Sequence, residues 1–284
     1  LPILKAPILD WDSVPEVVDP VQGGGLDETS TRGQRKRAAV EAFLRVLREA
    51  LLPTDESVIA DLGCGAGNLA LPLAWWLQKD GYRVLGVDYH EKSLHRLQKR
   101  SQEAGVTLET LHMDLKHLIS TGSDANYGAS SSLDQCCAVV SLHACGMASD
   151  LAIAAATSRS LPFAVSPCCI GKIQKAWRKP NSMPPLEPEI EYPRSRWLRE
   201  QISQEEYRQL AAAADYSGTL ETSRMDAKAI ERQNRCRRAK QIVERDRLEW
   251  AREQFGYEVR MVELPRIGPL YPKRELLLGA KIGT

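Results

Sequence analysis

The sequence lacks the features that would tie it to a membrane or to one kind of charged partner. It has no apolar run of the roughly 18 residues that a membrane-spanning helix needs, and no secretory signal at its start. It has no excess of one charge either, because 38 lysines and arginines face 37 aspartates and glutamates. A net charge of +1 excludes a global field that draws the chain onto nucleic acid, so any basic surface must be local.

A disulfide framework is also absent. The seven cysteines are an odd number and lack the spacing of small secreted domains. Six of them lie in or beside apolar runs, namely Cys64, Cys136, Cys137, Cys145, Cys168 and Cys169. We therefore expect a reducing compartment such as the cytoplasm, with buried or active-site thiols.

The length of 284 residues, with 43% hydrophobic and 26% charged content, is typical of a globular chain of one large domain or two small ones. We predict an extended arm over residues 1–33 and one domain over residues 34–284, with a proline-rich insertion at 176–202. Because the chain starts at Leu1 rather than at a methionine, we expect it to be part of a longer protein.

Strand-like and helix-like patterns alternate along the domain. The predicted strands are 57–62, 82–88, 107–113, 136–142, 163–166, 257–263 and 275–282. The predicted helices are 34–52, 68–78, 91–104, 148–157, 203–215 and 226–254, the fifth with a capping box of Ser203 and Glu206. Strands separated by helices of this length indicate a parallel sheet, and the last two strands suit an antiparallel pair at its edge.

The most informative segment is the glycine loop after the first predicted strand. Its spacing is Gly-x-Gly-x-Gly over residues 63–67, which differs from the Gly-x-Gly-x-x-Gly of nicotinamide-binding folds. Glycines allow positive φ and a close approach of a ligand to the backbone. Asp61, two residues before the first glycine, would repel a pyrophosphate but would suit the ammonium group of a methionine moiety.

Two more carboxylates end the next predicted strands. Asp88 is placed to accept the hydroxyls of a ribose, and Asp114 to accept from an adenine amino group. The sequence therefore predicts S-adenosylmethionine as cofactor. A nicotinamide cofactor and a glycine turn that binds nothing are the alternatives. The residues assigned to the cofactor are Asp61, Gly63, Cys64, Gly65, Gly67, Asp88, Asp114 and Leu115.

At these residues the chain resembles class I methyltransferases, and later motifs narrow the resemblance. The motifs are 142–146 (Leu-His-Ala-Cys-Gly), 166–169 (Ser-Pro-Cys-Cys), 34–37, 192–195 and 255–257. They resemble the methyltransferase domain of the glutathione S-transferase C-terminal domain-containing family, and more distantly the eukaryotic tRNA 2′-O-methyltransferases. The resemblance implies an α/β, doubly wound, Rossmann-like fold whose seven-stranded, mostly parallel sheet has an antiparallel last strand. It also implies methyl transfer.

A group of thiols and one imidazole follows two strands that should be neighbours. We assign His143, Cys145, Cys168 and Cys169 to the catalytic, acceptor-facing side and assign no residue to a metal. Three interpretations stay open. The side chains pack the floor of a pocket, His143 acts as a general base oriented by Asp150, or the four hold Zn²⁺. Adjacent cysteines argue against the zinc site.

Local basic segments point to a possible RNA partner. The first holds Arg32, Arg35, Lys36 and Arg37 just before the glycine loop. The second is the predicted helix at 226–254, with Arg232, Arg235, Arg237, Arg238, Lys240, Arg245 and Arg247. The competing interpretation of both is a solvated helix face. Trp177 and Trp197 in the insertion either stack on bases or pin the insertion to the core.

These features together predict an S-adenosylmethionine-dependent methyltransferase, with S-adenosylhomocysteine as product and RNA as acceptor. A domain that binds the cofactor only as a scaffold, and a methyltransferase acting on a protein or small molecule, are the alternatives. A nicotinamide oxidoreductase is disfavoured by the glycine spacing. The sequence predicts neither the acceptor atom nor the oligomeric state.

Overall fold

A seven-stranded sheet runs through the computed structural model, which describes residues 9–51, 57–119, 130–142, 144–170, 173, 190–215, 227–265 and 274–281. The strand order is β3-β2-β1-β4-β5-β7-β6. The strands are β1 (Val58–Leu62), β2 (Arg83–Asp88), β3 (Glu109–His112), β4 (Cys136–Leu142), β5 (Phe163–Ser166), β6 (Tyr257–Glu263) and β7 (Glu275–Lys281). Because β7 is antiparallel to both β5 and β6 while β1 to β5 are parallel, the predicted fold class is confirmed.

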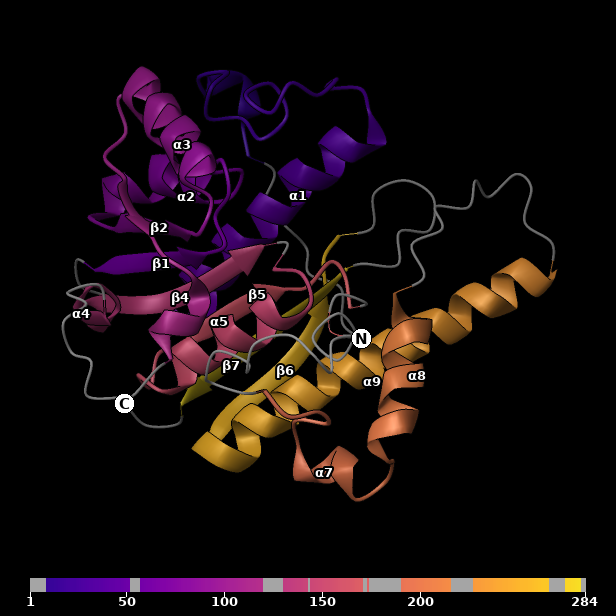
Figure 1. The fold of residues 1–284 in the computed structure, drawn as a ribbon. Coiled ribbons are helices and arrows are strands. Elements are labelled where there is room, and N and C mark those ends of the chain that lie inside the picture. Colours follow the sequence, from indigo (N-terminus) through magenta and orange to yellow (C-terminus); the bar gives the residue numbers. More distant parts are fainter. Residues whose placement is uncertain are drawn as a thin grey trace.

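Helices cover both faces of the sheet (Figure 1). One face packs against α1 (Thr31–Val46), α2 (Ala70–Leu77) and α3 (Glu91–Ala104), and the other against α5 (Met147–Thr157) and α9 (Ala227–Phe255). Neighbouring residues of β1 show the alternation, since Ile59 joins the first core and Ala60 the second. A central strand buried on both faces must be apolar throughout, which explains its continuous hydrophobic pattern.

The predicted elements match the structure closely. The strands β4, β5 and β6 and the helix α3 have the predicted bounds, and most other predicted elements differ by one or two residues at their ends. The predicted helix 34–52 is divided into α1 and a π-helical turn over Leu47–Leu51. The predicted capping box is confirmed at the start of α8 (Gln204–Ala214), where Ser203 and Glu206 bond each other's backbone N–H groups. Two short helices complete the described set, α4 (Ser130–Asp134) and α7 (Arg196–Arg199).

The segment before α1 packs against the domain. Val14, Val18 and Val21 are buried, and a short 3-10 helix covers Trp11–Ser13. The helix α1 begins at Thr31, earlier than the predicted residue 34, because the Ser30 hydroxyl caps it by accepting from the Gly33 N–H at 3.0 Å. Residues 1–8 of the predicted arm lie outside the described residues.

A smaller core joins α7, α8 and α9 at one end of the sheet. It includes Tyr192, Leu198, Tyr207 and Val243, so the described part of the predicted insertion, residues 190–202, packs on α9. Residues 176–189 of that insertion lie outside the described residues. Among the described helices, none combines the length and the apolar character that a membrane crossing requires.

Candidate functional site

From β1 the chain first adds strands on one side of the sheet (β2, β3) and then on the other (β4, β5), so a topological switch point lies between β1 and β4. In doubly wound sheets the ligand crevice lies at the carboxyl ends of the strands at such a point. The glycine loop lies there, held by N–H groups of Gly63 and Cys64 that donate to the Val87 carbonyl at 2.8 and 3.1 Å. Gly63 and Gly65 have φ of 77° and 54°, and a Cβ on either would meet no atom of the described residues within 4 Å. The loop therefore borders open space, which suits a ligand at its backbone.

Asp61 lies beside this loop at the end of β1 and is fully buried. Among the described residues, neither of its carboxylate oxygens has a hydrogen-bond partner. Burial raises the pKa of Asp61 to about 8, and the negative charge of Asp88 adds to this increase. The nearby backbone N–H of Ala70 partly opposes it. A buried carboxylate without a partner is unfavourable by itself, so the position suits a cationic ligand group.

Asp88 ends β2 and organises the same loop. Its carboxylate accepts from the N–H groups of Gly65 and His90, both at 2.8 Å. A carboxylate has about four lone-pair sites, so two of them stay available for ribose hydroxyls. Cys64 is buried against both acids, and burial with their charges raises the pKa of its thiol, so it is an unreactive packing group.

Tyr89 lies beside the candidate site and was not singled out from the sequence. It follows Asp88, is 61% exposed, and its ring lies 3.8 Å from the ring of His90 between centroids. An exposed aromatic ring beside the Asp88 carboxylate is able to stack on a planar ligand group such as a purine. The signal in the sequence was the aromatic residue directly after the acid that ends the second strand.

Arg100 was missed as well. From α3, its guanidinium donates to the carbonyls of Ala66 in the glycine loop at 2.5 Å and of Val17 in the N-terminal segment at 2.9 Å. The N-terminal segment is thereby tied to the cofactor loop. Nothing in the local pattern around Arg100 marks this long-range contact.

Asp114 and Leu115 lie at the end of β3. The exposed Asp114 is the N-cap of a 3-10 helix over Leu115–Leu118, and its side chain accepts from the Lys116 N–H at 3.0 Å. Leu115 is buried in the core that faces α5. Capping of the 3-10 helix gives Asp114 a structural role, and it occupies only one of the two carboxylate oxygens, so the other is available for a ligand.

The predicted thiol group is brought together at the carboxyl ends of β4 and β5. The sulfurs of Cys145 and Cys168 are 2.8 Å apart, and those of Cys168 and Cys169 are 3.7 Å apart. The hydrogen bond with Cys145, burial and the neighbouring thiols raise the pKa of the Cys168 thiol. His143 lies outside the described residues.

The suggested orientation of His143 by Asp150 is not tested, because His143 lies outside the described residues, and Asp150 makes other contacts. Its carboxylate accepts two hydrogen bonds from Arg247, at 3.1 and 2.9 Å, and one from the Tyr192 hydroxyl at 2.8 Å. Arg194 is also 3.3 Å away. All four side chains are buried, so Asp150 anchors α5 to α9 and to the insertion.

The predicted basic surfaces are smaller than the sequence indicates. In the first segment Arg37 is paired with Asp19, whereas Arg32 is exposed. In α9, Lys240 and Arg247 are buried in ion pairs and are not surface groups. The predicted solvent exposure holds at the start of α9 for Arg232, Arg235 and Arg238.

Trp197 is fixed to α9. The Arg245 guanidinium lies 4.5 Å above its ring, and its backbone N–H donates to Glu253 at 2.9 Å. This arrangement favours the interpretation that the insertion is pinned to the core. Trp177 lies outside the described residues.

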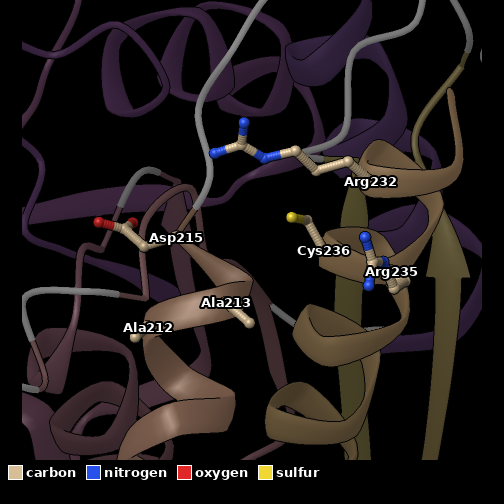
Figure 2. A pocket seen from close by; sticks show the side chains of 6 residues that line it. All are labelled: Ala212, Ala213, Asp215, Arg232, Arg235 and Cys236. Atoms are coloured by element: carbon tan, nitrogen blue, oxygen red, sulfur yellow. The ribbon is translucent and has the colours of Figure 1, made fainter. Parts of the chain in front are cut away.

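A pocket of about 450 Å³ opens between α8 and α9. Figure 2 shows Arg232, Arg235 and Cys236 of α9 across from Asp215 and two alanines at the end of α8. Asp215 accepts from the Ile170 N–H at 3.2 Å, and Ile170 directly follows Cys169. The pocket is therefore linked to the loop that carries the thiols, and among its described lining residues two are arginines and one is an aspartate.

Comparison with known proteins shows which families this chain resembles. Residues 35–176, half of the chain, match the family described as methyltransferase domain. The glutathione S-transferase C-terminal domain-containing protein of Xenopus laevis is 27% identical over 275 residues, which are 96% of this chain and 38% of that relative. An uncharacterized RNA methyltransferase of Thermosynechococcus vestitus is 32% identical over 78 residues, covering 28% of this chain and 16% of the relative.

A solved small RNA methyltransferase is 13% identical, with a TM-score of 0.42, and covers 87% of this chain and 26% of that one. The chain spans less than two fifths of the length of the Xenopus relative, although the match covers nearly all of this chain.

Proposed function

This chain belongs to the methyltransferase-domain family, and from that premise we propose that it transfers a methyl group from S-adenosylmethionine to RNA. The resemblance that the sequence motifs carry to the glutathione S-transferase C-terminal domain-containing family is confirmed. The chain is an S-adenosylmethionine-dependent methyltransferase domain, and the choice of RNA as acceptor is the proposal.

The residues at the carboxyl edge fit the cofactor. Among the described residues, none hydrogen-bonds the buried carboxylate of Asp61 and none fills the space over Gly63 and Gly65, so the described part of the chain leaves room for a ligand at the loop. We propose that Asp61 holds the ammonium group, Asp88 the ribose and Asp114 the adenine amino group. When bound, the cofactor supplies a reactive sulfonium methyl, so the protein mainly aligns the acceptor and excludes water.

The acceptor side is proposed to lie beside β4 and β5. Cys145, Cys168 and Cys169 line it, and His143 is proposed as a polar contact to the acceptor. The raised pKa of Cys168 disfavours a free thiolate nucleophile of the kind that attacks a flipped cytosine.

Tyr89 is proposed to stack on the adenine. Replacing it with alanine is expected to weaken S-adenosylmethionine binding roughly tenfold, because one aromatic–base stack contributes about 1–3 kcal/mol. Isothermal titration calorimetry measures the effect. The Tyr89→Phe variant keeps the ring and should bind like the wild type; equal affinities for Tyr89→Ala and Tyr89→Phe would remove Tyr89 from the site.

The observation that carries the RNA proposal is the pocket between α8 and α9. Arg232 and Arg235 are exposed, line the pocket together, and lie on the side of the protein connected to the thiol-bearing loop through Asp215. Guanidinium groups bind phosphate with paired hydrogen bonds. An RNA strand whose phosphates occupy this pocket would have neighbouring nucleotides near the acceptor side.

We predict that the double variant Arg232→Gln/Arg235→Gln binds RNA at least tenfold more weakly. The slope of log affinity against log salt should become shallower by up to about 2, since each lost phosphate contact removes about 0.7–0.9. Filter binding of total RNA at several salt concentrations, together with transfer of labelled methyl to that RNA, measures both effects. Cofactor affinity should stay at the wild-type value.

Arg238→Gln is the matched control, because Arg238 is exposed on the same helix and does not line the pocket. It should retain most of the RNA affinity. If both variants lose affinity equally, the pocket is not a specific RNA contact. If the wild type transfers no methyl group to any RNA but methylates protein or small molecules, the proposed acceptor class is wrong.

A further inference from the structure

Three sulfur atoms converge at the carboxyl ends of β4 and β5. The Sγ atoms of Cys145, Cys168 and Cys169 all lie within 4.8 Å of one another, and each residue is half-buried. We propose that these three thiols bind one Zn²⁺ ion and leave its fourth coordination position open to water or another oxygen ligand.

The spacing of the sulfurs agrees with one tetrahedral ion. With Zn–S bonds of about 2.3 Å, two sulfurs on the same tetrahedral zinc are about 3.8 Å apart. Cys168 and Cys169 are already separated by 3.7 Å between sulfurs, although they are adjacent in the chain. The Cys145 sulfur is 2.8 Å from that of Cys168 and within 4.8 Å of that of Cys169, and a shift of about 1 Å away from Cys168 gives that pair the separation that one ion requires.

The backbone holds the two cysteine loops together without the ion. Leu142 of β4 is in register with Ser166 of β5, so both loops leave the sheet side by side. Gly146, at φ 63°, makes the turn after Cys145, and its N–H donates to the Cys169 carbonyl at 2.8 Å. The Gly146 carbonyl in turn accepts from the buried Arg247 at 2.8 Å. A site held by strand ends and supporting hydrogen bonds is preorganised for a ligand.

Zinc also explains the grouping of thiols chemically. Three protein ligands with one open position are the arrangement of catalytic rather than structural zinc sites. Zn²⁺ binds the thiolate form of cysteine, so binding of the ion would release the protons of these thiols to solvent. A disulfide would use only two of the thiols and leave the third without a role.

The test is the metal content of the chain purified under reducing conditions. We expect about one zinc per chain by mass spectrometry of the metal, and a loss to near zero in the triple variant C145S/C168S/C169S. Replacement of zinc by Co²⁺ should give the intense sulfur-to-metal absorption of a three-thiolate site. A chelator should raise the number of thiols that react with a thiol reagent by three.

The matched control is C136S/C137S, which removes an adjacent cysteine pair at the opposite end of β4 and should retain the zinc. If the triple variant does not fold, the cobalt spectrum and the chelator experiment on the wild type decide the question. Zinc retained in a folded triple variant, a wild type without zinc, or a Cys145–Cys168 disulfide would each overturn the proposal. None of these readouts requires methyl transfer, so the metal site can fail while the proposed RNA function holds.

Discussion

Replacing Arg247 with methionine is expected to destabilise the folded chain by about 3 kcal/mol, because it leaves buried carboxylates without their main cation. The guanidinium is fully buried and donates to Asp150, to Glu244 at 2.8 Å and to the Gly146 carbonyl. Methionine fills much of the same volume, so the loss is chiefly electrostatic. The expected fall in the melting temperature is roughly 5–10 °C.

Part of the ion-pair network survives in this variant. The expected loss of stability therefore lies at the lower end of the about 3–5 kcal/mol that breaking a buried ion pair typically costs. Asp150 keeps its hydrogen bond from Tyr192, and Glu244 keeps Lys240 at 3.1 Å. Denaturant unfolding followed by circular dichroism measures the free energy. Combining Arg247→Met with Asp150→Asn should cost less than the sum of the two single changes, because the second change removes the uncompensated charge.

Arg252→Met is the matched control, since Arg252 lies five residues further along α9 and is 59% exposed. Exposed ion pairs contribute up to about 1 kcal/mol, so this variant should stay near the wild-type stability. Equal losses for the two variants would show that Arg247 acts through helix propensity alone and that the buried network adds nothing.

The sequence predicted the sheet well because its strands are recognisable locally. Buried strands such as β4 and β5 are short continuous apolar runs, and the helices between them show a 3.6-residue period. The start of α1 was predicted three residues too late. Gly33 suggested a turn, whereas in the structure it lies in the first turn of the helix and donates to the Ser30 cap. The number of strands in the sheet followed from the family resemblance, and their order was not predicted.

The partners of the charged residues in α9 could not be predicted in the same way. Arg247 and Asp150 are separated by 97 positions, and the helix sequence around Arg247 resembles a solvated, mixed-charge face. Which arginines turn inward depends on α5 and on the insertion packing against α9. For that reason the sequence of the helix was compatible with phosphate contacts or with a solvated face along its whole length, whereas the buried Lys240 and Arg247 can contribute to neither.

In the candidate site, too, some features were predictable from the sequence and others depended on the three-dimensional structure. The carboxylates at the ends of β1, β2 and β3 were predictable, because parallel strands bring their carboxyl ends to one edge. The spacing of Cys168 and Cys169 was not, because the separation of adjacent sulfurs depends on the loop conformation after β5. Sequence adjacency alone argued against a shared ligand, and the geometry removes that objection.

The affinity for S-adenosylmethionine is expected to rise about tenfold per pH unit between pH 6 and 7 and to level off near pH 8 in the wild type. The reason is the buried Asp61 carboxyl, whose pKa is raised to about 8, chiefly by burial. Binding of an ammonium group requires the ionised carboxylate, so a proton must leave Asp61 when the cofactor binds below that pH. Above pH 8 the amino group of the ligand itself begins to lose its proton, since α-amino groups titrate at about 7.7–8.0.

Asp61→Asn separates this effect from folding. Asparagine keeps the shape but carries no charge, so the affinity at pH 8 should fall about 10–100-fold, the effect of losing a hydrogen bond to a charged group. The rise in affinity for S-adenosylmethionine between pH 6 and 8 should also disappear in this variant. Calorimetric titration at several pH values measures both, and a variant that retains the wild-type pH profile would show that the ammonium binds elsewhere.

The stability of the cofactor-free chain should change in the opposite direction. Because the pKa of Asp61 is higher in the folded than in the unfolded chain, its contribution to stability is complete below about pH 4 and is lost as the pH rises through about 8. The Asp61→Asn variant should therefore gain stability relative to the wild type between pH 6 and 9 while it loses affinity. Asp80→Asn, at an exposed position, should show neither change. A residue needed only for folding would lose stability and affinity together, so opposite changes in the two quantities identify Asp61 as a group that tolerates an unfavourable burial in order to bind a cation.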